Sequence, residues 1–162
     1  MKNLFLIRHG QSMANADSEI YSKVPDWKIP LSAKGFEQAK IVANEFPKMI
    51  RSMPLAYYYS PMQRAMQTAK VIRMSILSNL IFEREEPLIS EQSFGMINSY
   101  FGSFTNRVMM EEREKYGSFY YTPPDGESGI DVLLRVRRFL DDCENRNHEN
   151  VVIVSHGSFL KV

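Results

Sequence analysis

The stretch LFLIRHG at residues 4–10 is a run of four apolar residues that stops at arginine, histidine and glycine. The stretch VVIVSHG at residues 151–157 has the same design, with serine in place of arginine. Short apolar runs of this kind are typical of buried strands in a parallel sheet. We therefore predict a strand in each stretch, and we expect 4–7 to be a central strand that is buried on both faces.

Between these two strands, apolar residues occur either in short runs or at helical spacing. The predicted strands are 56–59 and 80–89, and the predicted helices are 32–46, 60–72, 105–116 and 128–143. Ser32 and Ser60 are the expected N-caps, and Pro47 is expected to end the first helix. Residues 17–31 contain two prolines and are predicted to be a loop. The alternation of strands and helices predicts a three-layer α/β/α fold with a mainly parallel central sheet.

Length and composition predict a single globular domain over residues 1–162. The net charge is +1, so no global field favours nucleic acid or an anionic membrane surface. No apolar run approaches the roughly 20 residues of a membrane span, and the first residues lack the cleavage site of a signal peptide. The single cysteine, Cys143, excludes an internal disulfide. We therefore expect a cytoplasmic protein that binds neither nucleic acid nor membrane.

Polar residues follow several of the predicted strands, and parallel sheets bind ligands beyond the carboxyl ends of their strands. We therefore expect Arg8, His9, Arg64 and His156 to share one pocket. Two guanidinium groups can hold a phosphoryl group through paired hydrogen bonds, and histidine can act as a nucleophile or a phosphate ligand. This set indicates phosphoryl transfer through a phosphohistidine. It needs no metal or other cofactor, because arginine and histidine neutralise the phosphoryl oxygens.

An ordered set of motifs across the chain resembles the histidine phosphatase superfamily, which includes the cofactor-dependent phosphoglycerate mutases. The motifs are RHGQS at 8–12 with Asn15, RAMQTA from Arg64, Glu91 ahead of FG, GES at 126–128 and SHG at 155–157. The stretches PDWKIPLSAKG at 25–35, ISEQSFG at 89–95 and GSFYYTPPDGES at 117–128 are similar to phosphoglycerate-mutase-like proteins of plants and fungi. The resemblance implies the phosphoglycerate-mutase-like version of the α/β/α fold.

The resemblance also implies a role for each matching residue. His9 corresponds to the histidine that is phosphorylated, and Glu91 to the acid that protonates the leaving oxygen and then activates the incoming one. The residues that hold the phosphate are implied to be Arg8, Asn15, Arg64 and His156. A positioned acid accelerates the loss of an alkoxide by roughly 10²–10⁴-fold, so the role of Glu91 is also chemically sensible.

Several residues keep two interpretations. Gln11 and Ser12 either contact the substrate or cap the turn after the first strand. Glu127 either begins a helix or lines the mouth of the substrate pocket. Helix amides near Gly157 can help to bind an anion, and Gly10 and Gly157 let the backbone turn sharply and approach a ligand. Trp27 and the tyrosines at 57–59 are expected to be packing residues.

The leading hypothesis is a phosphatase that hydrolyses a small phosphorylated substrate. The alternatives are a phosphoglycerate-type mutase and a non-catalytic module that binds a phosphorylated ligand. The chain also departs from the family pattern in two places. MINSY at 96–100 replaces the usual residues after FG, so a relative's substrate cannot be transferred. The usual helix and tail after residue 157 are expected to be missing. Whether the protein is a monomer or a homodimer is left open.

Overall fold

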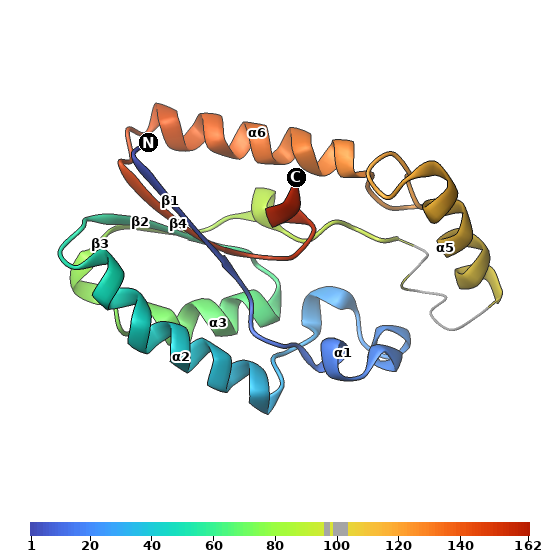
Figure 1. The fold of residues 1–162 in the computed structure, drawn as a ribbon, viewed down its shortest axis with the longest axis horizontal. Coiled ribbons are helices and arrows are strands. Elements are labelled where there is room, and N and C mark those ends of the chain that lie inside the picture. Colours follow the sequence, from blue (N-terminus) through green and yellow to red (C-terminus); the bar gives the residue numbers. More distant parts are fainter. Residues whose placement is uncertain (96–97, 99–103) are drawn as a thin grey trace.

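Four parallel strands form the centre of the structure (Figure 1). The computed structural model describes residues 1–95, 98 and 104–162. Its strands are β1 (Asn3–Arg8), β2 (Leu55–Tyr59), β3 (Leu80–Glu85) and β4 (Asn150–Ser155). Within the described residues the sheet order is β1-β4-β2-β3, and every neighbouring pair is parallel. The mainly parallel sheet that the sequence predicts is therefore confirmed.

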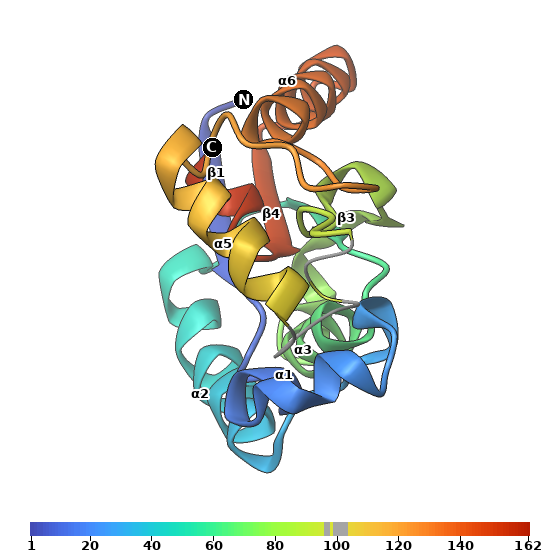
Figure 2. The ribbon, with the colours of Figure 1, turned by 90° about the vertical axis from the view of Figure 1, so that its right-hand side faces the viewer.

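Helices cover the two faces of this sheet (Figures 1 and 2). The longer helices are α2 (Ala33–Ile50), α3 (Gln63–Arg73), α5 (Phe104–Tyr116) and α6 (Gly129–Asn145). The short elements are α1 (Met13–Ala16) and the 3-10 turns Ser18–Ser22, Asp26–Lys28, Leu77–Asn79, Pro87–Ile89 and Phe159–Lys161. Helices α2 and α3 pack on one face and α6 packs on the other, which confirms the three-layer α/β/α architecture.

Two clusters of buried side chains join the three layers. Full burial of a large apolar side chain contributes about 1.5–3 kcal/mol, so these clusters supply most of the driving force for folding. The cluster between the sheet and α2 and α3 contains Phe46, Ile50, Leu55, Tyr57, Ala69, Ile72, Val152 and Val154. The cluster between the sheet and α6 contains Ala56, Tyr58, Ile89, Val132, Phe139, Cys143, Val151 and Ile153. The expected packing role of the tyrosines is confirmed for Tyr57 and Tyr58.

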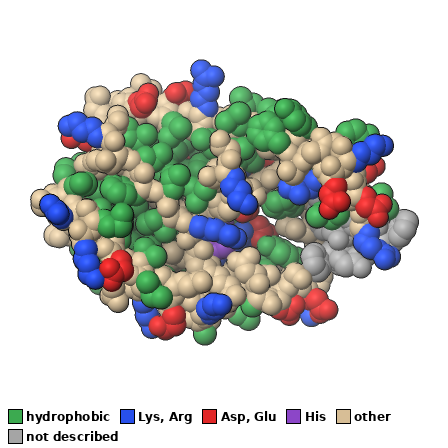
Figure 3. Space-filling model, in the orientation of Figure 1, with side chains coloured by type: hydrophobic (Ala, Val, Ile, Leu, Met, Phe, Trp, Pro, Cys, Tyr) green, Lys and Arg blue, Asp and Glu red, His purple; other side chains and the backbone are tan. Residues whose placement is uncertain are grey.

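Strand β1 lies at the edge of the sheet, so the prediction of a central strand buried on both faces is wrong. Its only neighbour in the described sheet is β4. Phe5 and Ile7 pack on the α2 side, but Leu4 and Leu6 point the other way and are 38% and 52% exposed. The reason is the position of α6, which covers β4 and β2 and does not reach β1. Figure 3 shows apolar side chains at the surface of this face.

The helix starts at Ser32 and Ser128 are confirmed by their caps. The Ser32 hydroxyl accepts a hydrogen bond from the Gly35 amide, and Ser128 forms a reciprocal capping box with Asp131. Pro47 does not end α2, which continues to Ile50. Proline removes only one amide donor from the last turn, and the buried side chain of Ile50 holds that turn against the core.

Three other predicted boundaries differ from the structure. Helix α3 begins at Gln63 with Met62 as its N-cap, rather than at Ser60, whose hydroxyl accepts a hydrogen bond from the Met62 amide at 3.3 Å. Strand β3 ends at Glu85, since Pro87 begins a 3-10 turn. The predicted loop at 17–31 contains two 3-10 turns.

The departure from the family pattern at 96–100 lies outside the described residues except for residue 98. In the described part of the chain, no helix is both long and apolar enough to cross a bilayer.

Candidate functional site

The carboxyl ends of β1, β4 and β2 meet at one edge of the sheet. The pairing of β1 with β4 sets Arg8 opposite Ser155, and the His9 amide donates to the Ser155 carbonyl at 3.0 Å. The next residue after each strand end is therefore a histidine at the same level. The ring centroids of His9 and His156 are 5.0 Å apart, so the two histidines are neighbours, as the sequence predicts.

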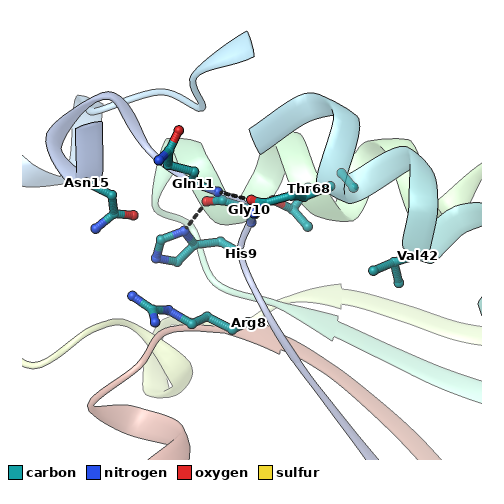
Figure 4. Close-up of a pocket in the computed structure, with 9 residues that line it drawn as sticks. Arg8, His9, Gly10, Gln11, Asn15, Val42 and Thr68 are labelled. Atoms are coloured by element: carbon teal, nitrogen blue, oxygen red, sulfur yellow. Dashed lines mark hydrogen bonds between the residues drawn. The ribbon is translucent and has the colours of Figure 1, made fainter. Parts of the chain in front are cut away.

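His9 is fixed in one tautomer by its own backbone. Its Nδ1 lies 2.7 Å from the Gly10 carbonyl oxygen, and a carbonyl can only accept a hydrogen bond. In the neutral ring the proton therefore sits on Nδ1, and the lone pair is on Nε2. Figure 4 shows this second nitrogen on the side of Arg8 and Asn15. Burial lowers the pKa of His9 to about 4, and the charges of Arg64 and Arg8 add to this effect. Near pH 7 the ring is therefore neutral, and a neutral imidazole can act as a nucleophile.

A pocket of about 230 Å³ brings most of the predicted residues together. Arg8, His9, Asn15, Arg64, Glu91 and Gly157 all line it. The side chain of Arg8 lies over Gly157, where an added Cβ would be 3.4 Å from the Arg8 Cζ. Among the described residues, no carboxylate forms an ion pair with Arg8. A positive group next to a neutral nucleophile is suited to a phosphoryl group.

A second, wider hollow of about 550 Å³ opens on the other side of His9 (Figure 4). It is lined by Gln11, Gln38, Val42 and Thr68 in addition to the residues around His9. Gly10 forms its floor, where the Gly10 amide donates to Thr68 Oγ1 at 3.1 Å. A Cβ on Gly10 would come within 2.3 Å of the Gly35 carbonyl oxygen. The close contact with α2 therefore requires a glycine at this position.

Arg64 is paired with an acid that the sequence analysis did not single out. Its Nη1 donates to Asp26 Oδ1 at 2.9 Å and to the Asp26 carbonyl at 2.7 Å, and its Nη2 lies 3.3 Å from Oδ2. Arg64 is only 3% exposed, so this is a buried charge-assisted pair. The pair fixes the guanidinium at the pocket wall. A phosphate bound in the pocket would share the guanidinium of Arg64 with Asp26.

Glu91 is held in the pocket by backbone amides. Its Oε1 accepts hydrogen bonds from the amides of Gln92 (3.0 Å), Ser158 (3.1 Å) and Phe159 (3.4 Å). The amides of Ser158 and Phe159, which follow Gly157, therefore bind this side chain. Three amide donors on one oxygen fix the position of the carboxyl group. The proximity of Glu91 to His9 and Arg64 is what the implied acid role requires.

The backbone of Glu91 is tied to α6 by a second pair that the sequence analysis missed. Arg135 donates to both carboxylate oxygens of Glu127 at 2.8 Å, and also to the carbonyls of Leu88 (2.5 Å) and Ser90 (3.2 Å). Glu127 also accepts from the Ser93 amide at 2.9 Å. Glu127 does not line the pocket, so it neither forms the substrate mouth nor merely begins a helix. It connects the segment that carries Glu91 to α6.

The turn after β1 is organised by caps. Ser12 is the N-cap of α1 and forms a capping box with Asn15, which confirms the capping interpretation of Ser12. Asn15 uses its Oδ1 in that box, so its amide nitrogen is the atom left to serve a ligand. The Gln11 side chain accepts from Ser32 Oγ at 2.8 Å. Gln11 lines the wider hollow and not the pocket that contains Glu91.

His156 lies behind His9 and does not line the pocket. Its Nε2 is 2.7 Å from Ser60 Oγ. Its Nδ1 is buried and has no hydrogen-bond partner among the described residues. Burial, together with the charge of Arg64, lowers the pKa of His156 to about 2. The ring is therefore neutral near pH 7, and its centroid lies 5.0 Å from that of His9.

Residues 1–95, 98 and 104–162 contain no group of three or more histidine, cysteine, aspartate or glutamate side chains that could hold a metal ion.

Several known proteins are similar to this chain in sequence. The model of the histidine phosphatase superfamily (branch 1) matches residues 4–162. Phosphoglycerate mutase-like protein AT74H of Arabidopsis thaliana is 34% identical over 96% of this chain and 62% of its own length. Protein AT74 of the same plant is 36% identical over 96% of this chain and 54% of its length. The chain thus spans less than two thirds of these relatives. The adenosylcobalamin/alpha-ribazole phosphatase of Escherichia coli is 28% identical over 98% of this chain and 75% of its own length.

Solved structures match the fold over nearly the whole chain. TTHB049 of Thermus thermophilus has a TM-score of 0.66 at 26% identity, covering 97% of this chain and 79% of that one. The mycobacterial glucosyl-3-phosphoglycerate phosphatase bound to inorganic phosphate has a TM-score of 0.77, covering 99% and 75%. Its identity is 22%, so this likeness concerns the fold.

Proposed function

Because the chain belongs to the histidine phosphatase superfamily, we propose that it is a phosphatase that hydrolyses a small phosphomonoester through a phosphohistidine on His9. The observation that carries this proposal is the pocket in which a neutral His9, a buried Arg64 and a fixed Glu91 lie together. The names of several relatives, which include an alpha-ribazole phosphatase, support the same reaction class.

The first step is attack of the His9 Nε2 lone pair on phosphorus. The bond between phosphorus and the ester oxygen breaks, and Glu91 donates its proton to that oxygen, so the product leaves as an alcohol. Arg8 and Arg64 balance the charge on the phosphoryl oxygens. The His9 ring becomes positively charged in this step. The Gly10 carbonyl stabilises that charge because it accepts the hydrogen bond that the Nδ1–H group donates.

In the second step, the Glu91 carboxylate takes a proton from water, and the water oxygen attacks the phosphorus of the phosphohistidine. The bond to Nε2 breaks, and inorganic phosphate is released. A mutase would follow the same first step but would transfer the phosphoryl group to another hydroxyl. The names of the phosphoglycerate mutase-like relatives keep this as the second candidate. The two reactions differ in the acceptor and therefore in the product.

The test is release of inorganic phosphate from p-nitrophenyl phosphate in the presence of EDTA. We expect turnover by the wild-type chain and none by His9→Ala. Quenching in alkali, in which phosphohistidine survives, should trap a covalent phosphoryl group on the wild type and none on the variant. Activity that survives in His9→Ala would refute the nucleophile. Binding of phosphate without any label or turnover would instead indicate a non-catalytic binding module.

A further inference from the structure

An open groove of about 440 Å³ adjoins the phosphate pocket on the side of Glu91. Asp26 and Glu91 line both spaces, so the groove begins where the pocket ends. Its far wall consists of Trp27, Pro61 and Met62. The proposed function does not use this groove, because the phosphoryl group is held entirely by residues of the pocket.

Trp27 is 58% exposed, so the expectation that it is a packing residue is wrong. It is carried by the short 3-10 turn Asp26–Lys28, and the neighbouring Asp26 is bonded to the buried guanidinium of Arg64. The ion pair therefore fixes the position of the indole relative to the phosphate pocket. The Lys28 ammonium lies 4.8 Å from the centre of the indole ring.

Met62 connects the groove to the backbone of Glu91 and to the side chain of Arg64. Its sulfur lies 3.4 Å from the Glu91 amide nitrogen and 3.7 Å from Arg64 Nη2. Met62 is buried, so this wall of the groove is fixed. An acid that protonates the leaving oxygen has to touch it. The rest of the leaving alcohol must then extend beyond Glu91, and the groove is the space on that side.

The walls of the groove also define the chemistry of its ligand. Among the described residues that line it, the only ionisable side chains are Asp26 and Glu91, and no lysine or arginine is present. A carboxylate or a second phosphate on the alcohol would therefore find no cation on this wall. An aromatic ring would instead pack on the indole, the proline and the thioether, which are favourable partners for a flat apolar group.

We propose that this groove binds the alcohol part of the substrate, and that the alcohol is uncharged and carries an aromatic ring that packs on Trp27. The proposal rests on the proposed function, because that function places the phosphoryl group at His9 and the leaving oxygen at Glu91.

Three alkyl monoesters test the proposal. Their alcohols are similar as leaving groups, so the chemical step should be similar for all three and differences in kcat/KM report on contacts in the groove. They are benzyl phosphate, ethyl phosphate and 2-phosphoglycolate. We expect kcat/KM to be about tenfold higher for benzyl than for ethyl phosphate, from the stacking of one ring, and lower for 2-phosphoglycolate than for ethyl phosphate. Trp27→Ala should reduce the ratio of benzyl to ethyl kcat/KM about tenfold, through KM. Trp27→Phe should restore most of it.

Tyr116 provides a matched control. It is an aromatic side chain that is 60% exposed and has a lysine ammonium over its ring, but it lies at the end of α5. Tyr116→Ala should leave the ratio of benzyl to ethyl phosphate unchanged. An unchanged ratio in Trp27→Ala would overturn the proposal. So would a preference for 2-phosphoglycolate that disappears in Lys28→Gln, because it would make the lysine the recognition element.

Binding measurements separate the failure of this proposal from failure of the proposed function. If no ester is turned over and no phosphohistidine is trapped, the catalytic proposal has failed. Calorimetric titration of His9→Ala with benzyl and ethyl phosphate still tests the groove. We expect the Kd of benzyl phosphate to be about tenfold lower, and this advantage should be lost in His9→Ala/Trp27→Ala. Equal affinity, or no binding of either ester, overturns the groove assignment.

Discussion

Acidification should destabilise the protein through the two touching histidines. The unfolded chain binds a proton on each ring near the ordinary pKa of 6.5, whereas burial lowers the pKa to about 4 for His9 and about 2 for His156 in the folded protein. Below pH 6.5 the unfolded state therefore binds more protons, and stability falls as the pH falls. The loss from His9 is complete near pH 4, and the loss from His156 continues to lower pH.

The size of the effect follows from about 1.4 kcal/mol per pH unit for each group. Between pH 6.5 and pH 5, an interval of about one and a half pH units, each histidine is protonated in the unfolded state and neutral in the folded state. Each should therefore lower the free energy of unfolding by about 2 kcal/mol, and the pair by about 4 kcal/mol. Both side chains are buried, so solvent screening does not reduce these values. The pKa of His148 is also lowered by burial, and this histidine adds a loss of the same sign.

The assay is urea denaturation at pH 8, 6.5 and 5 on the wild type and on His9→Asn and His156→Asn. The pH dependence within each variant is compared, so differences in absolute stability cancel. Each substitution should reduce the loss between pH 8 and pH 5 by about 2 kcal/mol, and His148→Asn provides the correction for the third ring. A free energy of unfolding that is independent of pH in this range would refute the reasoning. An equal pH dependence in all variants would do the same.

Three substitutions test other parts of the site. Arg135→Met should lower kcat for an alkyl phosphate by about 100-fold, because it releases the segment that positions Glu91. The loss of kcat for p-nitrophenyl phosphate, whose leaving group needs no proton, should be much smaller. Equal losses for the two substrates would indicate a purely structural residue. Gly35→Ala places a Cβ 2.1 Å from a carbonyl oxygen after β1, so urea denaturation should show a loss of about 1–3 kcal/mol. Ser60→Ala removes the partner of His156 and should cost about 1–3 kcal/mol in the same assay without moving the m-value.

Features that depend on local sequence were predicted well. The cap at Ser32 satisfies an amide only three residues away, so it can be recognised in a short window. The two histidines were predicted to meet because each follows a strand, and parallel strands place their carboxyl ends at the same edge. The burial of Tyr57 and Tyr58 likewise follows from a run of apolar residues in a strand.

Features that depend on distant partners were not predicted. The apolar run of β1 gives no sign that the strand lies at the edge, because its exposure depends on where α6 packs. Asp26 and Arg64 are separated by 38 residues, and Arg135 and Leu88 by 47, so neither contact leaves a pattern in a short window. The contact of Gly10 with Gly35 of α2 likewise joins residues 25 positions apart, and the sequence gives no sign of it.

The strand order has a consequence for how the protein is made. Strand β4 separates β1 from β2, so β1 has no partner strand in the described sheet until residues 150–155 have been synthesised. His9 and His156 are 147 positions apart, and such long-range contacts form late and slowly. A nascent chain that already contains His9 therefore has no assembled site, and its first strand remains an exposed edge that other chains can pair with. Assembly of the candidate site and protection from aggregation should both arrive in a single late event, the docking of β4.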